Sequence, residues 1–108
     1  MKQLHQEHDI DANGNPSGGL TIGTGLDIKW QNGPLGRGVD RKEPNGAFVE
    51  DVLRAAIGRL EFYQTASNRK FACRENAIAL THLETALLWL GKRTSDREER
   101  DVEGTHTP

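Results

Sequence analysis

Two apolar stretches decide the fold of this chain: VEDVLRAAIGRLEFY at residues 49–63 and AIALTHLETALLWL at residues 77–90. In both stretches apolar residues recur at three- and four-residue spacing, which is typical of helices with a buried face. A short polar segment, residues 64–70, separates them and is expected to be a loop. We therefore predict two long helices, over residues 47–63 and from residue 73 to residue 93 with continuation to 100, that form an antiparallel hairpin.

The second stretch is more apolar than a single partner helix requires, since ten of its fourteen residues are apolar. The stripe expected to face the first helix consists of Ala77, Leu80, Leu83, Leu87 and Leu90. Ile78, Leu88 and Trp89 lie off that stripe. A helix that is apolar on several sides is covered on several sides. We expect an oligomer built through this helix; the alternative is that the front of the same chain covers it.

The glycine-rich front of the chain carries strand signals. Residues 26–31 (LDIKWQ) alternate apolar and polar side chains, which predicts a strand with one buried face, and residues 20–22 (LTI) are expected to pair beside it. Residues 32–34 (NGP) are typical of a turn, residues 36–45 are expected to be a loop, and Asn45-Gly46 a helix cap.

Together these signals predict the α+β fold class, with a small antiparallel β-sheet followed by a long two-helix antiparallel hairpin. Residues 1–19 are expected to be a flexible N-terminal segment. Residues 20–108 are expected to be a single domain, with the sheet at 20–46, the hairpin at 47–100 and a tail at 101–108.

Composition excludes several classes of protein. Fourteen basic residues face sixteen acidic ones, so the net charge of −2 provides no general attraction to a nucleic-acid polymer. One cysteine, Cys73, cannot build an internal disulfide or a four-cysteine zinc site. No apolar run approaches the roughly 18 residues of a membrane span, and the first residues lack an apolar signal segment. We expect a soluble protein of the cytosol.

Metal binding is weakly indicated at most. Residues 9–15 (DIDANGN) copy the first half of a calcium loop, but Leu20 stands where the loop needs a bidentate glutamate, which favours an Asx/Gly turn. His5 and His8 could meet a metal on a helix, but a mobile terminus is the favoured interpretation and no third ligand follows nearby. No cofactor is expected.

A row of arginines ends the second predicted helix. Arg93, Arg97 and Arg100 fall at i, i+4 and i+7, on one helix face. Like charges at this spacing destabilise a helix slightly, and an anionic ligand would offset that cost; guanidinium groups fit phosphate in particular. The alternative is a solvated face, on which Asp96 and Asp101 neutralise Arg100 and Arg97.

Aromatic and amide side chains flank the predicted interhelix loop. Phe62, Tyr63 and Phe71 are followed by Arg74 and Asn76. Rings stack on bases and an amide can bind a base edge or a sugar hydroxyl, although such residues also serve as core and loop residues. In an antiparallel hairpin this loop and the arginine row lie at opposite ends of the second helix. They can form one site only if another subunit brings them together.

Several segments resemble the phage Thoeris anti-defence protein 1 family. The resemblance covers roughly residues 20–107 and is carried by GLDIKWQNGP (25–34), the stretch 49–63, FACREN (71–76), residues 83–90 and RTSDREERDVEGTH (93–106). The spacing of Arg74, Thr81, His82 and Leu83 resembles that of the phage anti-CBASS protein 2 sponges as well. Two departures are a longer loop at residues 65–70 and Asp101, where the family often has glycine.

The resemblance implies a sponge protein and no enzyme. The family shares a helical hairpin domain with the phage anti-CBASS protein 2 sponges and forms dimers or hexamers. Its members bind cyclic nucleotide signals of bacterial immunity, such as glycocyclic ADP-ribose made by Thoeris TIR proteins, in the host cytoplasm. Some members bind CBASS cyclic oligonucleotides at a second site.

Carried onto this chain, the family's ligand contacts fall on the aromatic residue near Tyr63 (with Phe62 or Phe71 in its place if the longer loop shifts it), on Asn76, and on Arg93 and Arg97. Arg74 and Thr81 are candidates for a second, cyclic-oligonucleotide site. The alternative functions are a small phage nucleic-acid-binding regulator, against which the net charge argues, and a nucleotide-cleaving enzyme with His82 or His106 as base.

Overall fold

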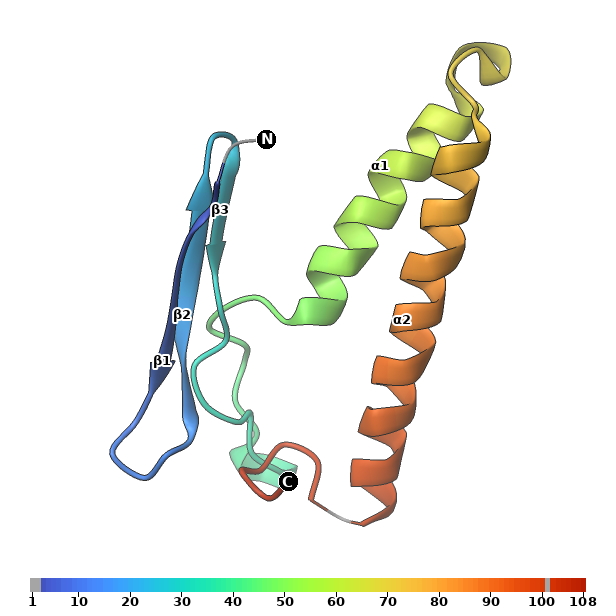
Figure 1. The fold of residues 1–108 in the computed structure, drawn as a ribbon. Coiled ribbons are helices and arrows are strands. Elements are labelled where there is room, and N and C mark those ends of the chain that lie inside the picture. The colour runs from blue at the N-terminus through green and yellow to red at the C-terminus, as the bar shows by residue number, and fades with distance from the viewer. Residues whose placement is uncertain (1–2, 101) are drawn as a thin grey trace. The chain divides into compact units, whose positions relative to one another are not determined.

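A small three-stranded antiparallel sheet precedes two long helices in the structure, a computed structural model that describes residues 3–100 and 102–108. The elements are β1 (His5–Ile10), β2 (Pro16–Gly23), β3 (Leu26–Lys29), a short 3₁₀ helix (Gly38–Asp40), α1 (Val49–Arg69) and α2 (Arg74–Glu99), as Figure 1 shows. The predicted α+β class, with the sheet ahead of the helices, is confirmed.

The chain forms two compact units. The sheet unit comprises the residues up to Phe48 together with those from Arg97 to Pro108, and the helical unit comprises Val49–Asp96. The last residues of α2 and the chain end thus belong with the sheet. The predicted division of the chain at residue 20 stays a prediction.

The sheet has the strand order β1-β2-β3, and a buried threonine marks its centre. Thr21 Oγ1 accepts a hydrogen bond from Trp30 Nε1 (2.9 Å) and donates one to Gln6 Oε1 (3.2 Å). These bonds satisfy the hydroxyl that burial removes from water. The predicted pairing of residues 20–22 with the following strand is confirmed, with Leu20 opposite Lys29.

The N-terminal segment, predicted to be flexible over residues 1–19, differs from expectation, because β1, a turn and the first part of β2 occupy residues 5–19. The turn between the strands is the predicted Asx/Gly turn: Asp11 Oδ1 accepts from the amides of Asn13 (2.9 Å) and Asn15 (3.0 Å). His5 and His8 lie on β1, where residues three apart point to opposite faces of the sheet. Among the described residues there is no cluster that could hold a metal ion.

A set of side-chain to backbone bonds fastens the segment before α1 to the end of the sheet. Gln31 Oε1 accepts from the amides of Asn45 (2.8 Å) and Gly46 (3.2 Å), and Asn45 Oδ1 accepts from the amide of Asn32 (2.8 Å). The predicted capping role of Asn45-Gly46 is wrong, because the Asn45 side chain bonds Asn32 and α1 begins only at Val49.

The first helix extends further than its apolar stripe. Regular helix continues past Tyr63 to residue 65, and Ala66 then leaves the helical region. Ser67, Asn68 and Arg69 follow with positive φ of 53°, 55° and 66°, a left-handed turn that reverses the chain. The loop predicted from residue 64 therefore starts two residues too early. Ile57 is the one buried apolar residue among those described.

The second helix carries a half-covered stripe and a bare one. Leu80, Leu83, Leu87 and Leu90 are half-buried as predicted, whereas Ala77 is exposed and Asn76 lies half-buried in its place. Ile78, Leu88 and Trp89 are 40%, 74% and 66% exposed. No residue of α2 is buried. Within the described residues, neither helix has the length and apolarity needed to cross a membrane.

Candidate functional site

An arginine and two aromatic rings cluster on the last turns of α1. The guanidinium carbon of Arg59 lies 4.9 Å from the Phe62 ring centre and 5.0 Å from that of Tyr63, and Arg59 Nε donates to the Tyr63 hydroxyl (3.2 Å). The two rings are 5.9 Å apart at an angle of 55°. Phe62 and Tyr63, both predicted site residues, thus lie together and are 51% and 37% exposed.

The third predicted aromatic residue, Phe71, stands apart from this cluster. It lies in the connection between α1 and α2, is 56% exposed, and has Lys70 Nζ 5.5 Å above its ring. Within the described residues, the Phe71 ring contacts neither the Phe62 ring nor the Tyr63 ring. Phe62 and Tyr63 are therefore better placed than Phe71, because the two rings share one cation.

Asn76 lies in the first turn of α2, just after the connection that leads from α1. The Gln64 side chain fixes this junction, since its oxygen accepts from the amide of Cys73 (3.0 Å) and its nitrogen donates to the Cys73 carbonyl (3.1 Å). The half-buried Asn76 amide forms no side-chain hydrogen bond within the described residues. We call Arg59, Phe62, Tyr63 and Asn76 the aromatic end.

The two predicted arginines lie far from this end along the same helix. Arg93 follows Asn76 by seventeen residues of α2, which at 1.5 Å per residue places them about 25 Å apart. Arg93 is exposed and forms no ion pair within the described residues. Arg97 follows one helical turn later. We call Arg93 and Arg97 the arginine end; a single chain does not bring the two ends together.

Arg97 is half-buried because the tail, residues 102–108, folds back against it. Its Nη2 donates to the carbonyls of Val102 (3.2 Å) and Thr105 (2.9 Å), and its Nη1 donates to the carbonyl of Thr107. The amide of Val102 in turn donates to the Arg97 carbonyl (3.0 Å). The guanidinium predicted to bind phosphate is therefore engaged with the chain's own backbone.

The solvated-face alternative for this row is wrong in part. Asp96 pairs with Lys92 (2.9 Å), and Arg100 donates to the Pro108 carbonyl (2.7 Å), so Asp96 does not neutralise Arg100. Asp101, the other predicted partner, lies outside the described residues.

A bidentate ion pair joins the tail to the loop that follows the sheet. Arg41 Nη1 and Nη2 donate to the Glu103 carboxylate at 2.7 and 2.9 Å, and the amide of Gly36 donates to the Gly104 carbonyl (2.9 Å). Hydrogen bonding to Arg41 holds the pKa of Glu103 below its usual value of 4.5, against the opposing effect of partial burial. Gly104 has φ of 78°, and a Cβ there would lie 2.4 Å from the Gly36 carbonyl oxygen, so this contact requires glycine.

The residues predicted for a second site lie on the first turns of α2. Arg74 and Thr81 are both exposed and, seven residues apart, share a helix face with a rise of about 10 Å between them. The Thr81 hydroxyl donates to the Ala77 carbonyl (3.2 Å) of its own helix.

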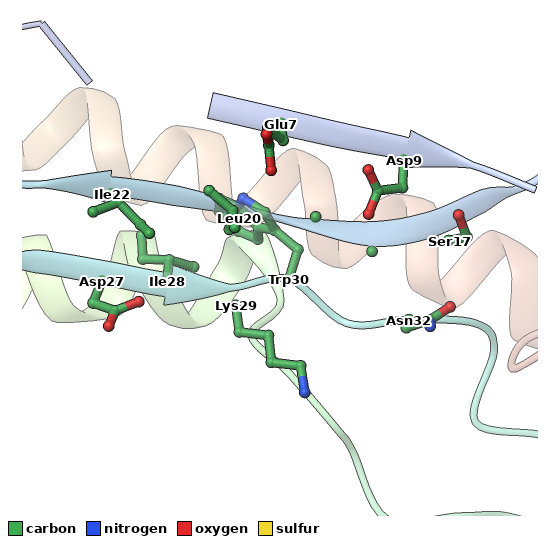
Figure 2. Close-up of a pocket in the computed structure, with 12 residues that line it drawn as sticks. Glu7, Asp9, Ser17, Leu20, Ile22, Asp27, Ile28, Lys29, Trp30 and Asn32 are labelled. Carbon is green, nitrogen blue, oxygen red and sulfur yellow. The ribbon is translucent and has the colours of Figure 1, made fainter. Parts of the chain in front are cut away.

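The sheet unit contains a pocket of about 360 Å³ over one face of the sheet (Figure 2). Its polar lining includes Glu7 and Asp9 from β1, Asp27 and Lys29 from β3, and Asn32. None of the predicted ligand residues lines it.

Sequence reasoning missed Arg59, Arg41 and Glu103. Arg59 could have been found, because its i, i+3 and i+4 spacing to Phe62 and Tyr63 places all three on one helix face. The Arg41–Glu103 pair could not, since 62 residues separate its members and only the folded loop joins them.

Two comparisons with known proteins agree. Residues 23–95 match the family described as Acb2/Tad1, hairpin domain. Over 79 residues, the chain is 48% identical to "Thoeris anti-defense 1" of Bacillus phage SBSphiJ7, an alignment that covers 73% of this chain and 51% of that protein. The chain thus spans about half the length of this curated relative.

Proposed function

Because the chain belongs to the Acb2/Tad1 hairpin-domain family, we propose that it is a phage anti-defence protein that sequesters a signal of Thoeris immunity. The signal is of the cyclic ADP-ribose type, with glycocyclic ADP-ribose as the first candidate, and the protein binds it without cleaving it. The observation that carries the proposal is the 48% identity to a protein named for Thoeris anti-defence.

The exposed groups suit such a ligand. Cyclic ADP-ribose isomers contain an adenine ring, ribose hydroxyls and two linked phosphates. The rings of Phe62 and Tyr63 offer stacking surfaces, the Asn76 amide has free donors and an acceptor, and Arg93 and Arg97 offer forked cations for the phosphates. For Arg97 this role requires that the tail give up some of its carbonyl contacts.

The pocket is proposed to form between copies of the chain. Asn76 and Arg93 lie about 25 Å apart along α2, farther than a compact cyclic dinucleotide can reach. The bare stripe of Ile78, Leu88 and Trp89 supports a homo-oligomer, a dimer or a hexamer, because large apolar side chains exposed together on one helix favour an interface. The aromatic end of one copy then meets the arginine end of another.

A second ligand class is proposed for the exposed pair Arg74 and Thr81, which would bind a CBASS cyclic oligonucleotide where several copies of α2 meet. The support is that the matching hairpin domain is described jointly for two protein families. Calorimetry with a panel of cyclic di- and trinucleotides is expected to show heat that Arg74→Ala removes. Absence of heat with the parent protein contradicts this second site.

The decisive experiment for the main proposal is capture and release. The protein is incubated with TIR-derived cyclic ADP-ribose isomers, freed of unbound ligand by filtration, heat-denatured, and the released molecules are chromatographed. We expect one isomer to be recovered intact and in proportion to the protein. Conversion of the isomer would indicate an enzyme, and complete passage into the filtrate would contradict the proposal. A salt-dependent shift of random duplex DNA would instead favour the nucleic-acid-binding alternative.

A further inference from the structure

Arg59 is the cation of the aromatic end. Its Nε bonds the Tyr63 hydroxyl, and its guanidinium faces two aromatic rings, yet within the described residues it has no carboxylate partner. The nearby Arg54, by contrast, pairs with Asp51 at 3.0 Å. On the face of α1 that Arg59 occupies, the residues one turn away are alanines and aromatics, so the helix itself supplies no counter-charge.

We propose that Arg59 is a further ligand-binding residue, whose guanidinium binds a phosphate of the same nucleotide whose base stacks on Tyr63 or Phe62. This inference rests on the proposed function, which gives ligand contacts at the aromatic end only to the rings and the Asn76 amide, and it adds a cation to them. The ligand that fits this end therefore carries a base and a phosphate a few ångströms apart on one molecule.

The donor inventory of Arg59 supports this role. A guanidinium has five N–H donors, and the Tyr63 hydroxyl uses one of them, at Nε. The donors of the two terminal nitrogens have no acceptor within the described residues. They form the planar fork that matches two phosphate oxygens.

The exposure of the two rings argues that Arg59 does more than cover them. If Arg59 only covered the rings, they would be expected to be shielded, yet Phe62 remains 51% exposed and Tyr63 37% exposed. The Nε bond and the ring contacts orient the guanidinium before any ligand arrives. A pre-oriented side chain loses less conformational freedom on binding than a mobile one.

Arg59 also changes how the pocket between copies can work. If Arg93 and Arg97 were the only cations in the pocket, the first copy to meet a ligand would bind only one part of it. Its aromatic end would bind the base, or its arginine end would bind the phosphates. With Arg59, the aromatic end of one chain holds both, and the arginine end of the second copy adds the remaining cations. The pyrophosphate would then lie between guanidiniums from two copies.

The test compares Arg59→Met, Arg59→Lys and the control Arg54→Met by calorimetry with glycocyclic ADP-ribose. Methionine keeps much of the apolar stem but removes the charge and the fork. We expect Arg59→Met to weaken binding about tenfold, Arg59→Lys to recover part of the loss, and Arg54→Met to bind as the parent does. Circular dichroism confirms that each variant keeps its helices.

Two further readouts separate ligand binding from ring packing. If Arg59 acts through its charge, the difference between parent and Arg59→Met shrinks as salt is raised, because ions screen the phosphate. Tyr63 is the only tyrosine, so a fluorotyrosine label gives one fluorine resonance that reports on ring orientation without ligand.

The outcomes distinguish this inference from the proposed function. Parent-like affinity of Arg59→Met, in a protein whose Arg93→Ala variant has lost the ligand, overturns the role of Arg59 and leaves the proposed function standing. The role of Arg59 is also overturned if the loss of affinity in Arg59→Met is independent of salt and the Tyr63 resonance is displaced without ligand. Arg59 then only packs against the rings. Failure of the parent to bind any isomer removes both.

Discussion

The aromatic end and the arginine end differ in how much of their binding capacity the chain itself uses. At the aromatic end, Tyr63 and Phe62 are exposed and the terminal nitrogens of Arg59 are free of acceptors within the described residues. At the arginine end, three carbonyls of the tail occupy Arg97, while Arg93 is exposed. One end is thus open to a ligand, and the other is partly closed by the protein's own backbone.

The difference shows that residues equivalent in sequence need not be equivalent in the fold. Arg93 and Arg97 have the same chemistry and stand one helical turn apart. Yet Arg93 belongs to the helical unit and falls within the matched family segment, residues 23–95, whereas Arg97 belongs to the sheet unit and lies just beyond that segment. In the proposed function Arg97 would combine two tasks, holding the tail and binding the ligand, whereas Arg93 would have only the second.

The largest effect is expected from separating the two ends altogether. The double variant Leu88→Glu, Trp89→Glu places charges on the bare stripe of α2 and is expected to abolish assembly, because like charges would face each other across the interface. Light scattering should then report a 12.0 kDa monomer, and ligand capture should be lost with it. A monomer that captures the ligand as well as the parent would contradict a pocket between copies.

The next effect distinguishes the two arginines. Arg93→Ala is expected to weaken ligand binding by about ten- to a hundredfold, because a phosphate oxygen loses a charged partner. Arg97→Ala is expected to cost at least as much and also to free the tail, since three carbonyls lose their donor. Hydrogen exchange of residues 102–108 should rise in Arg97→Ala and stay unchanged in Arg93→Ala. Equal protection of the tail in both variants would show that Arg97 does not hold it.

A smaller effect concerns the Arg41–Glu103 pair. The pKa of Glu103 is lowered in the docked tail, so its stabilising contribution is complete above the usual value of 4.5 and is lost as the pH falls through the lowered pKa. Tail protection should therefore be constant from about pH 7 to about pH 5 and decline only in stronger acid. Glu103→Gln should lower protection already at neutral pH and remove the acid dependence. Loss of protection between pH 7 and pH 5 would point to another group.

The sequence predicted the helices well because their signal is local. Apolar residues at three- and four-residue spacing located α1 and α2, and alternation located β3. β1 (HQEHDI) has no such alternation and is exposed throughout; its strand conformation depends on pairing with β2, which a local pattern does not report. The two extra residues of regular helix in α1 and the left-handed residues 67–69 likewise carry no glycine or proline signal.

The candidate site was predictable in its residue types but not in its contacts. Chemistry and spacing indicated the aromatic residues, Asn76 and the arginine row, and the family resemblance narrowed the ligand contacts to Tyr63, Asn76, Arg93 and Arg97, which stay a prediction. The engagement of Arg97 could not be predicted, because its acceptors are backbone carbonyls, which every residue carries. The Glu103 partner depends on a loop whose path is fixed by folding and not by local sequence.

The central claim is that one ligand lies between the aromatic end of one copy and the arginine end of another. Complementation between two inactive variants tests this claim most directly. Tyr63→Ala, Asn76→Ala carries one tag, Arg93→Ala, Arg97→Ala carries another, and mixed assemblies are purified through both tags. Each variant alone should fail to retain glycocyclic ADP-ribose. In a mixed dimer one pocket receives both damaged ends and the other receives both intact ends, so about one parent-like site per two chains should be measured by calorimetry. Mixed assemblies that bind no ligand would contradict the account.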